Sequence, residues 1–340
     1  LKRLVDALEL EGDVTVFEQL AGCARLGIVD QIAEGDWDMA SRLTRALGRR
    51  RGGRAGPSDL AHVGRKEVEA ILADPRTERL FETIEAGSQQ ERRKAARVLE
   101  AMGDAAVERL VAALTATERG RVENFLIDML AALVPTSETA LRKELTPETG
   151  AEAAVKLIRA SAVVCRDPAP VFISGLSHSE QKVQSATLSE ARKVGGKVAQ
   201  QVLQWALTHG SAQVRLEAVK HLGEMARPES MAGLIQLTQT TTLVEVQREC
   251  CLAFGKMALT RGHHDKIVPV LAGILTPGFL RKDYHEDVRH AAAWALSQMT
   301  EADGARRALK KVTDDSNERV ARVARMTLDH RKSVDARKKG

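Results

Sequence analysis

The stretch HEDVRHAAAWALSQM, residues 285–299, decides the fold of this chain. Four of its apolar residues follow the spacing i, i+4, i+8 and i+11, and these are Val288, Ala292, Leu296 and Met299. Because successive residues of an α-helix are rotated by about 100°, all four fall within one narrow stripe. The stretch therefore predicts a helix that buries one face against neighbouring structure.

The same spacing recurs through most of the chain. The copies start at Glu91, Val122, Ala154, Val183, Val214, Val246, Val288 and Val320, with Glu91 standing where an apolar residue is expected. Successive starts are 31, 32, 29, 31, 32, 42 and 32 residues apart. A period of this length indicates stacked structural repeats rather than a single globular core.

Each interval also contains a second apolar segment, such as GKVAQQVLQWALTHG at 196–210 and HDKIVPVLAGILT at 264–276. Turn residues separate the two segments. Among them, Ser211 and Ser316 are expected to cap helices, because a serine hydroxyl accepts hydrogen bonds from the free amides of a first helical turn. We therefore predict an all-α fold, a right-handed α-α superhelix of about eight stacked helix pairs.

Two of these segments carry a family resemblance. Residues 211–226 (SAQVRLEAVKHLGEMA) and 285–299 resemble HEAT repeats, especially the short repeats of bacterial proteins related to phycobilisome lyases. The family's second helix carries a polar residue followed by Val-Arg, then Ala and Ala-Leu, which residues 287–296 match. Two copies depart from this pattern, since Gln247 and Ala321 stand where Arg is expected.

The resemblance covers about residues 76–331 and implies a HEAT-like solenoid whose second helices line a concave face. It implies no particular activity, because the family is defined by its scaffold. Tetratricopeptide repeats have a similar period but require tyrosines at set positions, and Tyr284 is the only tyrosine of this chain.

The domain organisation follows from where the repeat pattern begins and ends. Residues 1–48 are helical in character but lack the repeated spacing, so we expect an N-terminal helical subdomain or cap. Residues 49–58 (RRRGGRAGPS) are predicted to be a basic Gly/Pro linker. The HEAT-like array is expected over 59–331, and a basic tail over 332–340.

Composition restricts the class of protein. Lys and Arg number 51 and Asp and Glu 46, so the formal net charge is +5 over 340 residues, which permits an anionic partner without requiring one. The four cysteines form no C-x-x-C motif, and Cys250 and Cys251 are adjacent, which favours a reducing cytoplasm over a disulfide framework. No apolar run is long enough to predict a membrane-spanning helix. Because the first residue is Leu1, we expect a fragment or a processed chain.

The one long interval, of 42 residues, indicates an insertion at residues 276–286. Insertions in repeat proteins form loops on one face, often the binding face. This one contains Phe279, Arg281, Lys282, Tyr284 and His285, and aromatic and cationic side chains on a loop suit an anionic or peptide partner. The alternative is a tolerated insertion whose aromatic rings pack against neighbouring helices.

A second candidate surface lies on the repeated helices. Lys220, Arg248, His290 and Arg322 each stand two or six residues after the start of a copy, so they point away from the buried stripe. Such a basic stripe would attract phosphates or acidic peptides. Leu216, Leu252, Trp294 and Met326 occupy the same sector, which favours a protein-binding groove. A merely solvated face is the alternative.

Other polar residues allow structural or chemical interpretations. Deoxyhypusine hydroxylases are HEAT-like and hold iron with several His-Glu pairs, whereas this chain has one such pair, His285-Glu286. One pair cannot supply the ligands of two metals, so we expect no metal and no cofactor. Asp287 and Arg289 flank the buried Val288, and we interpret them as links between successive repeats rather than as a partner surface.

The sequence therefore favours a non-catalytic, cytoplasmic interaction scaffold that binds a partner protein through its concave surface and the 276–286 loop. No phosphate-binding loop, nucleophile motif or metal-ligand spacing is present in the sequence. The alternative is a nucleic-acid-binding protein that uses its basic stripes or the arginines of 49–54. A lyase-like role rests on the repeat alone. The sequence leaves the partner and the oligomeric state open.

Overall fold

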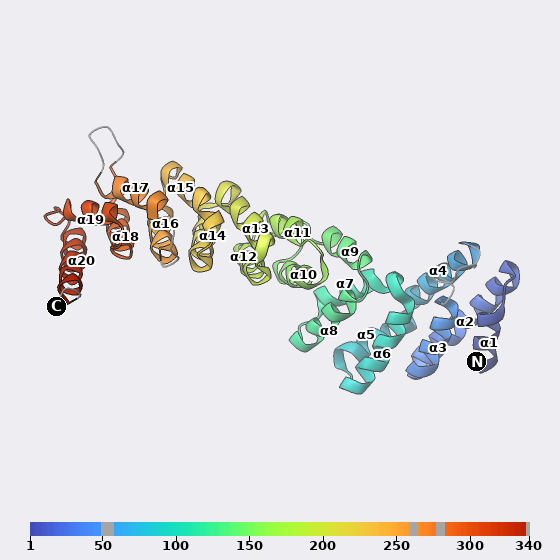
Figure 1. The fold of residues 1–340 in the computed structure, drawn as a ribbon. Coiled ribbons are helices and arrows are strands. Elements are labelled where there is room, and N and C mark those ends of the chain that lie inside the picture. Colours follow the sequence, from blue (N-terminus) through green and yellow to red (C-terminus); the bar gives the residue numbers. More distant parts are fainter. Residues whose placement is uncertain (49–57, 259–263, 277–282, 338–340) are drawn as a thin grey trace. The chain divides into compact units, whose positions relative to one another are not determined.

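The computed structural model of the 340-residue chain describes residues 1–48, 58–258, 264–276 and 283–337. All regular secondary structure within these residues is helical. The chain divides into two compact units, Leu1–Arg166 and Asp167–Gly340, which are described separately below (Figure 1).

The N-terminal unit contains the first ten α-helices. These are α1 (Lys2–Leu10), α2 (Val14–Glu34), α3 (Trp37–Gly48), α4 (Ser58–Ala73), α5 (Glu78–Ala86), α6 (Gln89–Met102), α7 (Val107–Ala116), α8 (Gly120–Ala131), α9 (Thr136–Glu144) and α10 (Ala151–Val164). Short 3₁₀ turns at Pro75–Thr77 and Gly103–Ala106 precede α5 and α7.

The C-terminal unit contains the remaining helices. These are α11 (Ala169–Leu176), α12 (Gln181–Val194), α13 (Gly196–His209), α14 (Ala212–Met225), α15 (Met231–Thr240), α16 (Val244–Met257), α17 (His264–Leu275), α18 (Glu286–Ser297), α19 (Asp303–Lys310) and α20 (Glu318–Arg337). Within this unit α14 packs on α16, α16 on α18 and α18 on α20, and these second helices form one row of the stack (Figure 1).

The predicted repeat is confirmed helix by helix. Each of the eight starts is the third or fourth residue of an even-numbered helix, from α6 to α20. The seven apolar starts are all buried, and the residues four positions later are buried as well. The period read from the sequence is therefore the spacing of the second helix in each pair, and the stripe forms the core.

Glu91 departs from the apolar pattern because it begins its helix in a different way. The Glu91 carboxylate accepts a hydrogen bond from the Ser88 backbone N–H at 2.9 Å, and the Ser88 hydroxyl accepts one from the Glu91 N–H at 3.3 Å. The hydrogen bond from Ser88 also lowers the pKa of the Glu91 carboxyl. This capping box satisfies two free amides of α6, while Ala95 and Leu99 continue the buried stripe.

In several copies the residue after the start closes the helix before it. Arg215 donates to the Thr208 carbonyl at the end of α13, and Arg289 donates to the Leu275 carbonyl at the end of α17, both at 3.3 Å. Gln247, which replaces the family's Arg, donates its amide to the Thr241 carbonyl at 2.9 Å. The last carbonyls of a helix have no intrahelical partner, so a side-chain donor at this position is what the repeat requires.

In the copy with alanine at this position, a residue one turn later supplies the side-chain donor. Ala321 has no donor, and Arg325 of α20 instead donates to the Thr313 carbonyl at 3.1 Å. The two departures from the family pattern thus keep its hydrogen bond by other means.

Gln247 gives the first testable prediction. Replacing it with leucine is expected to lower the free energy of unfolding by about 2 kcal/mol, because the Thr241 carbonyl loses its donor in a buried site. Gln247 is only 2% exposed, so water cannot replace the amide. Urea unfolding would measure the change. Gln213→Leu is the control, because Gln213 donates only to the exposed carboxylate of Glu217. Equal losses in both variants would contradict this role for Gln247.

The helices at the two ends of the chain have caps and packing contacts of their own. Asp36 caps α3 by accepting from the Met39 N–H at 3.0 Å, and α3 then packs on α6, as one second helix packs on the next. Residues 1–48 therefore extend the stack of the N-terminal unit. At the other end α20 runs to Arg337, beyond the predicted boundary at residue 331. The expected cap Ser316 is wrong, because Asn317 accepts from the Arg319 N–H at 3.0 Å.

Candidate functional site

The eight residues of the second candidate surface, four basic and four apolar, lie on four neighbouring helices of the C-terminal unit. We call them the second-helix face: Leu216 and Lys220 on α14, Arg248 and Leu252 on α16, His290 and Trp294 on α18, and Arg322 and Met326 on α20. Since each of these helices packs on the next, the residues form two rows across the helices. Each helix contributes one apolar and one basic residue to the face.

The cationic side chains of this face are available to a partner. Lys220, Arg248 and Arg322 are exposed, and none of them has an ion pair or hydrogen bond within the part of the chain that the structure describes. The nearby Arg319 behaves differently, because its guanidinium is paired with Asp287 at 2.9 Å. Three unpaired positive charges therefore remain on the surface of α14, α16 and α20.

His290 is part of the face but does not add to its charge. Burial of the imidazole lowers the pKa of His290 below its ordinary value of 6.5, and the nearby Arg319 guanidinium lowers it further. Arg319 Nη2 also lies 3.4 Å from His290 Nδ1, where it can donate to a neutral ring. His290 is therefore uncharged at neutral pH, so the sequence predicted its position but not its electrostatic role.

Met326 is the most exposed apolar residue of the face. Leu216, Leu252 and Trp294 are half-buried, whereas the Met326 side chain is 67% exposed. Met326 also lines a hollow of about 440 Å³ together with Thr300, Thr327 and His330. An unbranched, polarisable methionine beside an open hollow can adapt to an apolar side chain of a partner.

The predicted loop is described only in part. Phe279, Arg281 and Lys282 lie outside the described residues. Tyr284 is half-buried. The ring nitrogen Nδ1 of His285 accepts from the Asp287 N–H at 3.3 Å, so His285 is the N-cap of α18. For His285 the structure shows a helix-capping role, and its part in partner binding stays a prediction.

Asp287 and Arg289 link α18 to the next repeat, as the sequence indicated. Asp287 pairs with Arg319 of α20. Arg289 pairs with Asp315, and these two side chains are only 18% and 8% exposed. Similar pairs join other repeats, for example Arg192 with Glu224 at 2.9 Å. Such ion pairs hold successive helices in register and leave little of Arg289 for a partner.

The adjacent cysteines of α16 are packing residues rather than reactive thiols. Cys250 and Cys251 are fully buried in α16. Burial raises the pKa of Cys250 to about 12 and that of Cys251 well above its ordinary range, so both thiols stay protonated.

Among the described residues no three His, Cys, Asp or Glu side chains gather closely enough to hold a metal ion. The described helices include none with the length and apolar character to cross a membrane.

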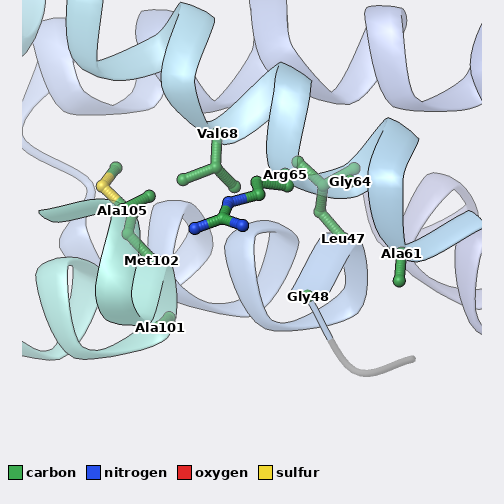
Figure 2. A pocket seen from close by; sticks show the side chains of 9 residues that line it. All are labelled: Leu47, Gly48, Ala61, Gly64, Arg65, Val68, Ala101, Met102 and Ala105. Carbon is green, nitrogen blue, oxygen red and sulfur yellow. The ribbon is translucent and has the colours of Figure 1, made fainter. Parts of the chain in front are cut away.

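A small hollow in the N-terminal unit lies among α3, α4 and α6. It measures about 60 Å³ and is lined mainly by Leu47, Ala61, Gly64, Val68 and Met102. Figure 2 shows the guanidinium of Arg65 extending across it toward Met102. This volume is far below the roughly 300–1,000 Å³ of ordinary ligand pockets, so the hollow is a packing defect rather than a binding site.

Comparison with known proteins identifies one repeat and the fold. The PBS lyase HEAT-like repeat model matches residues 91–116, from the capping box of α6 to the end of α7. No curated protein matches the sequence. A chain of the Pds5–Scc1 complex is similar in structure, with 12% identity and a TM-score of 0.52 over 96% of this chain and 59% of that one. This likeness shows the fold alone.

Two further solved structures are more distant. Human deoxyhypusine hydroxylase has 16% identity and a TM-score of 0.32, over 77% of this chain and 98% of that one. Kap121p has 15% identity and a TM-score of 0.37, over 96% of this chain and 40% of that one. This chain thus spans less than two thirds of the Pds5–Scc1 chain and of Kap121p. The family match over one repeat, the recurrence of its spacing from α6 to α20 and the stacked helix pairs show an α-solenoid fold of HEAT-like repeats.

Proposed function

We propose that the chain is a non-catalytic cytoplasmic scaffold that binds an acidic segment of a partner protein. The binding surface is the second-helix face, together with the 276–286 loop that the sequence predicts beside it. The observation that supports this is the pairing of charge with apolar surface. Three unpaired cations lie beside four apolar side chains on the same helices, and the most exposed apolar residue, Met326, borders a hollow.

The same surface fits a protein better than a nucleic acid. A phosphate backbone is best matched by a continuous row of cations. Here His290 is neutral at physiological pH, and apolar residues separate the charges. Apolar contact and charge complementarity together are typical of protein interfaces, in which a few buried side chains supply most of the affinity.

Binding of defined probes tests the proposal. Fluorescence anisotropy would be measured with three labelled probes: a peptide of glutamates and leucines, a peptide of glutamates and serines, and a DNA duplex. We expect the glutamate–leucine peptide to bind most tightly. Preferential binding of the duplex, with affinity that falls steeply with salt, would favour the nucleic-acid alternative instead.

Charge reversal locates the site. The triple variant Lys220→Glu, Arg248→Glu and Arg322→Glu is expected to weaken peptide binding at least about tenfold, because like charges then face the acidic peptide. The matched control reverses Lys197, Lys266 and Lys310, which are exposed on the first helices α13, α17 and α19 of the same unit. An equal loss in this control would show that only net charge matters. Tyr284→Ala tests the loop in the same assay.

A further inference from the structure

The first helices of the N-terminal unit leave a groove that the second-helix face does not include. This groove has a volume of about 920 Å³ and lies between α5 and α7. One wall consists of residues 78, 81, 82 and 85 of α5, and the other of residues 109, 112, 113 and 116 of α7. Both sets follow the spacing of a single helix face, so each helix presents one continuous wall.

Ion pairs tie the two walls together at both ends of the groove. At one end the Arg109 guanidinium pairs with Glu78 and lies 4.9 Å from the centre of the Phe81 ring. At the other end Arg119 donates to the Glu85 backbone carbonyl at 2.7 Å, and the Thr117 hydroxyl donates to the Glu85 carboxylate at 2.7 Å. Arg119 also pairs with the Glu85 carboxylate at 3.5 Å, so both arginines of the groove are engaged by its own carboxylates.

Small side chains leave the middle of the groove open. Ala112 and Ala116 are exposed and Ala113 is half-buried, and their methyl groups cannot reach α5. The Phe81 ring completes an apolar floor. The volume lies at the upper end of the roughly 300–1,000 Å³ that ligand-binding clefts enclose, which is enough for several side chains of a docked segment.

The charge that remains in the groove is negative. Glu82 and Glu118 are exposed at its middle and rim, and neither has an ion pair or hydrogen bond among the residues that the structure describes. An unpartnered carboxylate on each side of an apolar floor is complementary to a cationic segment.

We propose that this groove docks a basic segment of another protein. An apolar side chain of that segment lies between Phe81 and the alanines of α7, and lysine or arginine residues on either side of it pair with Glu82 and Glu118. The chain then has two surfaces of opposite preference, one in each unit. The proposal does not depend on the second-helix face.

Anisotropy with the full chain tests this groove separately. The probes are a labelled peptide of lysines around a central leucine pair, the same peptide with serines in place of the leucines, and the glutamate–leucine peptide. Glu82→Lys with Glu118→Lys is expected to weaken binding of the lysine–leucine peptide about tenfold. Ala112→Trp, which fills the groove from an exposed position, is expected to weaken it as much, and Ala116→Arg provides a second blocking variant.

The matched control reverses two carboxylates away from the groove. Glu100 and Glu144 are exposed on α6 and α9 and have no ion pair within the described chain, so Glu100→Lys with Glu144→Lys changes the net charge equally. Unchanged binding in this control supports the groove, and an equal loss overturns it. Full binding by both blocking variants also overturns it. A dimer in size-exclusion chromatography that the Glu82 and Glu118 changes dissociate would make a second copy the occupant and refute the proposal. The triple variant Lys220→Glu, Arg248→Glu and Arg322→Glu is expected to bind the lysine–leucine peptide as tightly as the unchanged chain. This result does not depend on whether the second-helix face binds an acidic segment, so the two proposals can fail separately.

Discussion

Replacing Gly223 with valine is expected to lower the free energy of unfolding by about 3 kcal/mol, at the upper end of ordinary overpacking costs. Gly223 lies in α14 where this helix meets α16. A Cβ atom at this position would lie 2.8 Å from the Cβ and 2.9 Å from the Cα of Ala253. Ala253 is buried and contributes backbone and a methyl group, which cannot rotate away. The valine therefore forces the two helices apart, and the neighbouring repeats lose contact.

Urea unfolding followed by far-UV circular dichroism, which reports the helices of both units, would measure this loss. Gly22→Val is the matched control, because Gly22 is inside α2 with no neighbouring atom within 4 Å of the added Cβ. It should change stability by less than about 0.5 kcal/mol, since valine is no worse a helix former than glycine. Adding Ala253→Gly to Gly223→Val should restore part of the loss. Equal losses at both glycines would point to a backbone effect and refute the packing argument.

The Gly223 contact illustrates what the sequence could not predict. Periodicity identified Val214, Ala218 and Leu222 as buried, because burial of a stripe depends only on rotation along one helix. Which residue of α16 faces Gly223 depends instead on the crossing of two helices. The fourth position of the spacing is buried at Met257 and Met299 but not at Val194, which is the last residue of α12 and is 39% exposed.

In the candidate site, too, the sequence predicts what depends on one helix and misses what depends on contacts between helices. The outward direction of Lys220, Arg248 and Arg322 followed from helix rotation, and the structure confirms that they are exposed. The charge of His290 could not be predicted, because it is set by burial and by Arg319 of the next repeat. The groove between α5 and α7 was missed as well. Its signal in the sequence is the group of alanines at 112, 113 and 116, which becomes meaningful only when the opposite wall is known.

Replacing Arg289 with leucine is expected to cost about 3 kcal/mol of stability, because it leaves the charge of Asp315 nearly buried and without its cation. Arg289 also closes α17 through the Leu275 carbonyl, so two groups lose their partner in one substitution. Thermal or urea unfolding would measure the effect. Arg319→Leu is the control, because its pair with Asp287 is exposed, at 56% and 42%, and is expected to contribute less than about 1 kcal/mol.

The double variant Arg289→Leu with Asp315→Asn separates the two contributions. Removing the charge of Asp315 while keeping an oxygen for the Asn317 N–H, which its carboxylate accepts at 2.9 Å, should recover at least half of the loss. No recovery would mean that the carbonyl at the end of α17, rather than the ion pair, is the essential partner of Arg289. If Arg289→Leu left stability unchanged and abolished binding of the glutamate–leucine peptide, Arg289 would belong to the binding surface, and our structural interpretation of the Val-Arg motif would be wrong.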